Sequence, residues 1–533
     1  MRRVFVCVSL AALLLSGCGE VTGSGGKTEA ARVDPKQVRA EDLKSAVSDE
    51  RVKRFYEARG WAAVWTDSLA AELTQALGQA GDHGINPESY LKDARSGGSA
   101  AEREAGLTLA ALNYAQALAT GVVDPRRIYE VYEVPMLKAD VVAGLGEAAG
   151  KEGAVGAWLA SLAPQDEEYK ALQQAYRQYR QRAGQEQRAA VQAGEKIEVG
   201  DRDPRVPQIA EGLRSAGYLA AAQPQQSQQP EKAKSKAGAE AKGKGAAAQP
   251  ASTLYTREIA EAVKKVQEDY GIKPDGIVGN STIEALNTGA RERARILAVN
   301  LERRRWLERT PAKTRIDVNT AAAHLDYWRD GQAVNRRRVV VGQPEWETPE
   351  LGSPIVRLVA YPPWTVPESI AEEEILPKGA AYMAKENISM KNGRLVQAPG
   401  PKSALGLVKF DMANKHAIYL HDTPAKALFA STDRHASHGC ARVEDAVGFA
   451  RLLAEDQGKL EEFDKALATK EETSVALTEK IPVRLLYHSA YFDGGRVVFR
   501  TDPYGWDDKL AQALGFEGQI RPRVAKHIGD IGP

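Results

Sequence analysis

Residues 437–444 read SHGCARVE, and residues 416–421 read HAIYLH. The second stretch alternates its side chains between two faces, as a half-buried β-strand does, so His421 is expected to point into a cleft. Similar strand signals recur between residues 312 and 500, with few helical patterns among them. We therefore expect a β-rich domain that brings His421 close to Cys440.

Cys440 is a candidate nucleophile. The chain has three cysteines, of which Cys7 and Cys18 lie in an N-terminal export signal, so Cys440 is the free thiol expected in the mature protein. A lone thiol near histidines in an exported protein favours nucleophilic catalysis over disulfide formation. Helically spaced apolar residues from Val443 to Leu453 predict a helix whose N-terminus lies just after Cys440 and stabilises a thiolate.

The N-terminus predicts export and lipidation. Two arginines precede an apolar run over residues 4–15, which is too short to span a bilayer well, and LSGC follows, ending at Cys18. This is typical of a signal peptide over residues 1–18, and LSGC resembles the bacterial lipobox, whose cysteine is lipidated. Residues 19–40 are expected to form a tether. The prediction is a periplasmic lipoprotein held to a membrane through Cys18, and the absence of Asp at position 19 favours the outer membrane.

The length of the chain indicates how many domains it has, and its net charge indicates which partners to expect. The 533 residues are enough for two to four domains, and 72 basic against 71 acidic side chains give a net charge of +1. Because neither sign dominates, we expect no nucleic-acid partner.

The region before the β-rich domain divides into two parts. Residues 41–190 carry helical spacing and predict a helical scaffold domain. Residues 203–290 form a split module that contains the turn DGIVG at 275–279 and resembles the small three-helix peptidoglycan-binding domain. Residues 220–252 interrupt this module, and their Ala-, Gln-, Lys- and Gly-rich composition without apolar periodicity predicts a disordered insertion.

The β-rich domain at 312–500 has two further features. Residues 366–402 interrupt the strand pattern with a Glu-rich and then Gly/Pro/Asn-containing insertion, which we expect to act as a lid. Residues 501–533 are expected to form a C-terminal tail.

The motif HDTP at 421–424 together with SHGC at 437–440 resembles the signature of the YkuD-type L,D-transpeptidases. Matches at 341–344 (VGQP) and 363–367 (PWTVP), and the order scaffold, peptidoglycan-binding module, catalytic domain, resemble the large multi-domain periplasmic branch of that family. The long insertion at 220–252 departs from the pattern but removes no catalytic group. The resemblance covers most of the mature chain.

The resemblance implies acyl transfer on peptidoglycan stem peptides without a metal or other cofactor. Attack on the third residue of a tetrapeptide donor and transfer to a second stem give a 3→3 cross-link, while water as acceptor gives carboxypeptidase activity. The implied catalytic residues are Cys440 as nucleophile, His421 as general base and acid, Asp422 as its orienting partner, His438 beside the thiolate, and Gly439 in the oxyanion hole. The implied substrate contacts are Tyr419, Trp364, Ser437 and Arg442, the last of which either docks a stem-peptide carboxylate or holds the loop.

Two other functions fit the same residues. The first is a wall-binding lipoprotein with an inert catalytic domain. The second is a zinc-dependent hydrolase, because His421, His435, His438 and Cys440 are residue types that ligate Zn²⁺.

Overall fold

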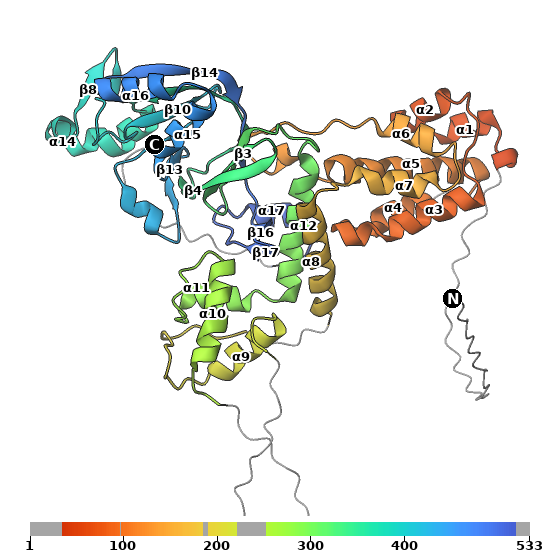
Figure 1. Ribbon diagram of the computed structural model, residues 1–533. Coiled ribbons are helices and arrows are strands. Elements are labelled where there is room, and N and C mark those ends of the chain that lie inside the picture. The colour runs from red at the N-terminus through yellow and green to blue at the C-terminus, as the bar shows by residue number, and fades with distance from the viewer. Residues whose placement is uncertain (1–34, 96–97, 185–189, 221–251, 519–533) are drawn as a thin grey trace, which may run out of the picture.

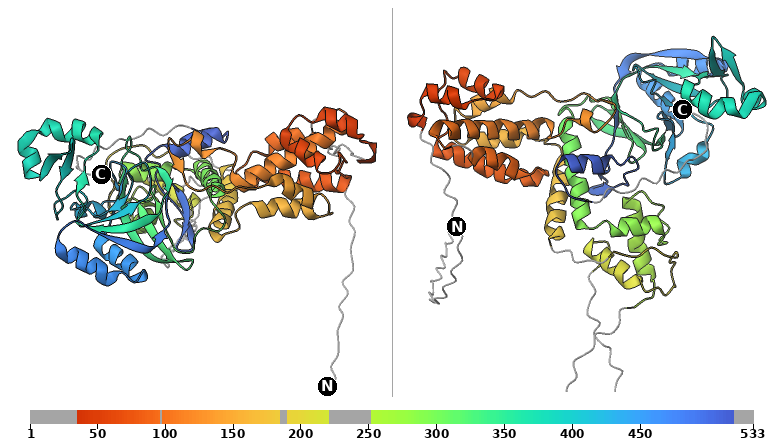
Figure 2. Two further views of the ribbon diagram at one scale, coloured as in Figure 1. Left: turned by 90° about the horizontal axis from the view of Figure 1, so that it is seen from above. Right: turned by 180° about the vertical axis from the view of Figure 1, so that it is seen from behind.

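The computed structural model describes residues 35–95, 98–184, 190–220 and 252–518. Three lobes surround two long neighbouring helices, α8 (Glu167–Ala183) and α12 (Ala290–Trp306), as Figure 1 shows. An arm made of the first seven helices projects to one side, away from the β-rich domain, and both views in Figure 2 agree on this. The expected signal peptide, most of the tether and nearly all of the insertion at 220–252 lie outside the described residues.

The arm is built around one buried helix, α5 (Ala100–Thr120), which opens with a capping box between Ser99 and Glu102. The buried carboxylate of Glu104 accepts hydrogen bonds from the backbone N–H groups of Val64 and Trp65. The other helices of the arm are α1 (Ala40–Ala46), α2 (Glu50–Glu57), α3 (Asp67–Gly78), α4 (Pro87–Arg95), α6 (Val141–Ala148) and α7 (Ala154–Leu162). Among the described residues, no helix is both long and apolar enough to cross a bilayer.

The region expected to be helical also contributes a strand to the β-rich domain. The strand β1 (Tyr132–Glu133) pairs in parallel with β5 (Glu350–Gly352) and thereby joins the scaffold to the large sheet. Its two residues are too few for strand periodicity to show in the sequence.

The small module consists of α9 (Val206–Ser215), α10 (Arg257–Asp269) and α11 (Asn280–Asn287). The side chain of Gln267 ties α10 to the turn that follows it, because its amide nitrogen donates to Ile277 O at 2.9 Å and its amide oxygen accepts the Gly276 N–H at 2.8 Å. The three-helix module expected at 203–290 is therefore present on both sides of the interruption.

The β-rich domain is organised along one continuous hydrogen-bonded path, in the order β1-β5-β15-β2-β3-β4-β13-β11-β10-β6-β14, with β12 also paired to β4. A buried apolar core lies against it, to which α15 (Ala446–Asp456) and α16 (Leu460–Thr469) contribute. The remaining strands of the sheet are β2 (Arg315–Asn319), β3 (His324–Arg329), β4 (Gln332–Gly342), β6 (Ile355–Ala360), β10 (Val408–Met412), β11 (Leu420–His421), β12 (His435–Ser437), β13 (Ala441–Val443), β14 (Thr473–Ile481) and β15 (Val483–Leu486).

The insertion expected at 366–402 is an ordered subdomain with a small apolar core of its own. A three-stranded sheet in the order β7-β9-β8 supports it. Its elements are β7 (Trp364–Thr365), α13 (Glu368–Ile370), η4 (Ala371–Ile375), η5 (Leu376–Lys378), α14 (Gly379–Lys385), β8 (Ile388–Lys391) and β9 (Arg394–Gln397). Its movement as a lid stays a prediction.

The expectation of a tail from residue 501 is wrong for its first part. After the hairpin of β16 (Ala490–Asp493) and β17 (Arg496–Phe499), the helix α17 (Trp506–Ala513) packs against α12. A buried ion pair of 2.5 Å joins Arg303 to Asp507. The tail prediction missed this because a single eight-residue helix gives little periodicity, and its burial depends on α12, some 200 positions earlier.

Candidate active site

The strands β11 and β13 bring Cys440 and His421 onto one face of the sheet. They pair in parallel, with His421 opposite Arg442, and the Ala441 N–H donates to Tyr419 O at 3.2 Å. Because side chains alternate along a strand, Leu420 and its partner Ala441 enter the core, while their neighbours point the other way. Cys440 and His421 are therefore diagonal neighbours on adjacent strands.

His421 is held in one orientation by the backbone. Its Nδ1 lies 2.5 Å from the carbonyl oxygen of Asp422, and the side chain is fully buried. A carbonyl oxygen can only accept a hydrogen bond, so Nδ1 carries the proton and Nε2 is the basic nitrogen. Asp422 thus orients His421 through its main chain.

The Asp422 carboxylate has a separate, structural task. It accepts the Leu407 N–H at 2.9 Å and forms an ion pair with Lys426. Gly406 makes this close packing feasible, because its φ is +59° and a Cβ there would collide with the carboxylate. The carboxylate therefore locks the turn that presents His421.

The Cys440 thiol is protonated at neutral pH in this conformation. The residue is only 4% exposed, and burial raises the pKa of the thiol to about 11. Hydrogen bonds with Tyr419 and the positive charges of Lys409 and Arg442 lower this pKa but do not offset burial. Sγ lies 3.7 Å from Ala417 O, in the range of a weak S–H donor bond.

The expected helix dipole does not reach Cys440. The helix α15 begins at Ala446, and the strand β13 separates it from the cysteine. The dipole effect falls off within the first turn of a helix, so it cannot stabilise a thiolate six residues away. The prediction of a preformed thiolate at a helix N-terminus is therefore wrong.

Hydrogen bonds from two side-chain hydroxyls hold the loop around Cys440 in place. Ser437 Oγ donates to Cys440 O at 2.6 Å and accepts the Gly439 N–H at 3.2 Å, while Thr348 Oγ1 donates to Gly439 O at 2.9 Å. Gly439 has a φ of +108°, which favours glycine. Ser437 is fully buried and shapes the loop, and its expected contact with substrate stays a prediction. The oxyanion role of Gly439 stays a prediction, because its N–H points to Ser437 here.

His438 connects the cysteine loop to the inserted subdomain. Its Nε2 lies 2.5 Å from Glu374 Oε1, and the ring of Trp346 packs edge-on against it with centroids 4.9 Å apart. Glu374 belongs to η4, so the subdomain reaches the residue two positions before Cys440. No sequence signal links Glu374 to His438, and the sequence analysis missed both Glu374 and Trp346.

Two of the remaining expected substrate contacts are also buried. Arg442 is 1% exposed between β4 and β11, which supports its structural alternative, and Trp364 is 1% exposed in the core of the inserted subdomain. Tyr419 is half-buried, and its ring packs against His421 with centroids 5.6 Å apart. Of the four expected contacts, Tyr419 is the one that substrate can reach without rearrangement.

Lys409 belongs to the site but was not expected there. It pairs with His421 across β10 and β11, and its Nζ lies 4.3 Å from the centroid of the Tyr419 ring. Alternation along β10 could have found it, because Lys409 is polar between two core residues.

The four proposed zinc ligands do not converge. Both ring nitrogens of His435 are used, by Asp433 Oδ1 and by Thr320 O, each at 2.9 Å. His438 is turned towards Glu374. Over the part of the chain that the structure describes, no three His, Cys, Asp or Glu side chains are arranged to hold a metal ion.

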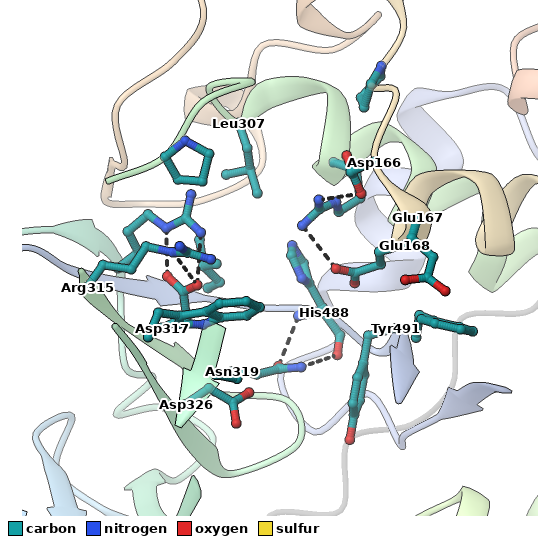
Figure 3. Close-up of a pocket in the computed structure, with 18 of the residues that line it drawn as sticks. Asp166, Glu167, Glu168, Leu307, Arg315, Asp317, Asn319, Asp326, His488 and Tyr491 are labelled. Atoms are coloured by element: carbon teal, nitrogen blue, oxygen red, sulfur yellow. Dashed lines mark hydrogen bonds and ion pairs between the residues drawn. The ribbon is translucent and has the colours of Figure 1, made fainter. Parts of the chain in front are cut away.

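A cavity of about 420 Å³ lies elsewhere, between the α8–α12 pair and the sheet, and Figure 3 shows its lining. Among the described residues, four of its five arginines pair with carboxylates, while Arg309 donates to backbone carbonyl oxygens. Asp317 accepts from Arg315 at 2.8 Å and from Arg484 at 2.7 Å, and Arg304 lies 3.2 Å from Glu168. We assign this cavity no chemistry.

Three parts of the chain match described families. Residues 313–465 match an "L,D-transpeptidase catalytic domain", residues 50–175 a "Scaffold domain", and residues 241–286 a "Putative peptidoglycan binding domain". These matches confirm the order of domains expected from the sequence.

Related proteins carry corresponding names. A Haemophilus influenzae protein named "Putative L,D-transpeptidase" is 34% identical over 220 residues, which are 37% of this chain and 45% of that protein, so the match spans less than half of the relative. A solved L,D-transpeptidase from Mycobacterium smegmatis is 14% identical over 32% of this chain and 58% of its own, with a TM-score of 0.18. One from Stackebrandtia nassauensis is 12% identical over 58% of this chain and 100% of its own, with a TM-score of 0.20.

Proposed function

This chain contains an L,D-transpeptidase catalytic domain at residues 313–465, and from that premise we propose that it forms 3→3 cross-links between peptidoglycan stems through a Cys440 acyl-enzyme. The observation that supports this most is the placement of Cys440 and His421 as diagonal neighbours, with Nδ1 of the imidazole held by the Asp422 carbonyl. The nucleophile then faces a base whose reactive nitrogen is already selected.

In the first half-reaction, Nε2 of His421 removes the thiol proton as Sγ attacks the carbonyl carbon of the third residue of a tetrapeptide donor. The tetrahedral intermediate collapses when the C–N bond to the terminal D-alanine breaks. His421 returns its proton to the leaving amine, and a thioester on Cys440 remains. The raised pKa of the thiol means that proton transfer must accompany attack.

In the second half-reaction, an amine of an acceptor stem attacks the thioester carbonyl. An amide bond forms, the C–S bond breaks, and His421 takes the proton of the incoming amine and passes it to the departing sulfur. Water in place of the amine gives a shortened stem and hence carboxypeptidase activity. The peptidoglycan-binding module supports a wall substrate for both outcomes.

The proposed location follows from the N-terminal sequence. Lipidation at Cys18 would anchor the protein to a membrane, with the outer membrane favoured, and place the catalytic domain in the periplasm. Mass spectrometry of the mature N-terminus tests this directly. A Cys18→Ala chain that remains membrane-bound would contradict the anchor.

The reaction is tested by incubating the purified protein with disaccharide-tetrapeptides and measuring product masses. We expect cross-linked dimers and released D-alanine from the natural chain and neither from Cys440→Ala, together with a covalent carbapenem adduct on Cys440. His416→Gln is the matched control, since His416 lies on the same segment but contacts Glu133 at 3.1 Å. Dimers from Cys440→Ala would overturn the mechanism, and loss of activity to a chelator would support a zinc hydrolase instead.

A further inference from the structure

A second cavity, of about 340 Å³, lies where the small three-helix module meets α8 and α12. Its lining includes Arg182 and Tyr179 from α8, Arg214 and Gly217 from the α9 region, and Arg293 from α12. Three segments far apart in the sequence therefore contribute an arginine each. The volume is within the range of small-ligand sites.

Arg293 is a buried cation that forms no direct ion pair among the described residues, although its charge partly offsets the burial that raises the pKa of nearby Asp269. It is 2% exposed, and its Nε and Nη1 donate to the hydroxyls of Tyr270 and Tyr179, each at 3.1 Å. The rings of Tyr179, Tyr218, Tyr270 and Phe499 surround the guanidinium with centroids 5.5–5.6 Å away. Among the described residues, no acid forms an ion pair with it. Buried charges in proteins are normally paired, so this one calls for an anion.

The nearest candidate acid is already engaged. Asp269 accepts from the Tyr218 hydroxyl at 2.7 Å and forms an ion pair with Arg496 of the β16–β17 hairpin. It therefore ties the module to the β16–β17 hairpin, and its single negative charge is shared among Arg293, Arg496 and Arg500.

The other two arginines strengthen the positive field. Nε of Arg214 is buried without a hydrogen-bond partner, although Nη1 of the same residue contacts the exposed Glu211 at 3.1 Å. The exposed guanidinium of Arg182 stands 5.5 Å from the centroid of the Tyr179 ring. Among the described residues that line this cavity, none is Asp or Glu. The lining of the cavity in Figure 3, by contrast, includes several Asp and Glu residues, and four of its five described arginines pair with carboxylates.

From this unbalanced charge we propose that the cavity binds a free carboxylate of a peptidoglycan stem peptide. The choice of stem peptide rests on the proposed function. Guanidinium groups bind carboxylates and phosphates through paired hydrogen bonds, so a phosphate is the other source of the same chemistry. A bound stem would touch both the binding module and the α8–α12 pair, and would anchor the catalytic domain on the wall.

The test is calorimetric titration of the full chain carrying Cys440→Ala with three probes: a disaccharide-tetrapeptide, the same compound with its carboxylates amidated, and inorganic phosphate. We expect Arg182→Gln and Arg214→Gln each to weaken one tetrapeptide binding event at least tenfold, and amidation to do the same. Arg257→Gln, on the exposed surface of α10, is the matched control and should change nothing. Arg293→Gln is added with circular dichroism to verify folding.

Unchanged tetrapeptide binding in both Arg182→Gln and Arg214→Gln would overturn the proposal, as would equal binding of the amidated compound. Binding of phosphate in preference to the tetrapeptide would overturn the assignment to a carboxylate. The cross-linking assay separates this inference from the proposed function. If the arginine variants lose this binding event and the natural chain forms cross-links, both the inference about the cavity and the proposed reaction are supported. If binding depends on the arginines but the natural chain forms no cross-links, only the proposed reaction is contradicted.

Discussion

The strand pair β11–β13 and the inserted subdomain at 366–402 each hold a histidine near Cys440, but they do so in different ways. His421 is fixed by the carbonyl of the next residue, inside a continuous sheet. His438 is held by Glu374, a side chain from a subdomain with its own core. The first contact lies between adjacent residues of one segment, whereas the second joins two segments 64 positions apart and breaks if the subdomain moves. The orientation of His421 therefore does not depend on the insertion through this contact, while that of His438 does.

The largest effect is expected from His421→Gln. It removes the general base while the thiol still has a pKa of about 11, so cross-linking should fall by about 10²–10⁴-fold. Steady-state rates of dimer formation measure this. If His438→Gln were the more damaging change, the assignment of the base to the strand pair would be wrong.

A smaller loss of activity is expected from changes at the contact between the inserted subdomain and the loop that carries Cys440. Glu374→Gln and His438→Gln should each lower kcat/KM by about tenfold, because each removes a charge-assisted hydrogen bond. The double variant should be no worse than the single ones, since both remove the same contact. Glu373→Gln, an exposed neighbour in η4, is the control. Additive losses would mean that the two residues act independently.

Lys409→Met should raise the pKa of Cys440 further, because the positive charge of Lys409 favours the thiolate. The pH profile of iodoacetamide alkylation should move to higher pH, with several-fold slower alkylation at pH values below the pKa. Lys415→Met, an exposed lysine paired with Glu133, is a control of the same chemistry. A shift to lower pH would contradict the sign of this interaction.

Tyr419→Phe is expected to give the smallest effect. It removes the hydroxyl that hydrogen-bonds Cys440 but leaves the backbone contact of residue 419, so the pKa of the thiol should rise by less than in Lys409→Met. The same alkylation profile measures it. A larger shift than in Lys409→Met would place the main stabilisation of the thiolate on the hydroxyl.

The sequence predicted the catalytic pair because local rules suffice there. Alternation along 416–421 placed Tyr419 and His421 together, and the structure confirms this even though only Leu420–His421 is regular strand. The helix after Cys440 was placed too early, because Val443 continues the helical spacing by chance while β13 pairs it with β4. At Val443, pairing between strands therefore outweighs the helical spacing of the sequence.

What the sequence by itself determined was the pairing of a candidate thiol with a candidate imidazole, the order of the domains and the split of the small module, since each depends on neighbours a few positions apart. Only the tertiary structure decided that the thiol is buried and protonated, that Glu374 reaches His438, that Lys409 joins the site, and that Arg293 forms no direct ion pair with any described acid. The reason is physical: burial and charge pairing depend on which distant segments pack together, and local spacing carries no record of them.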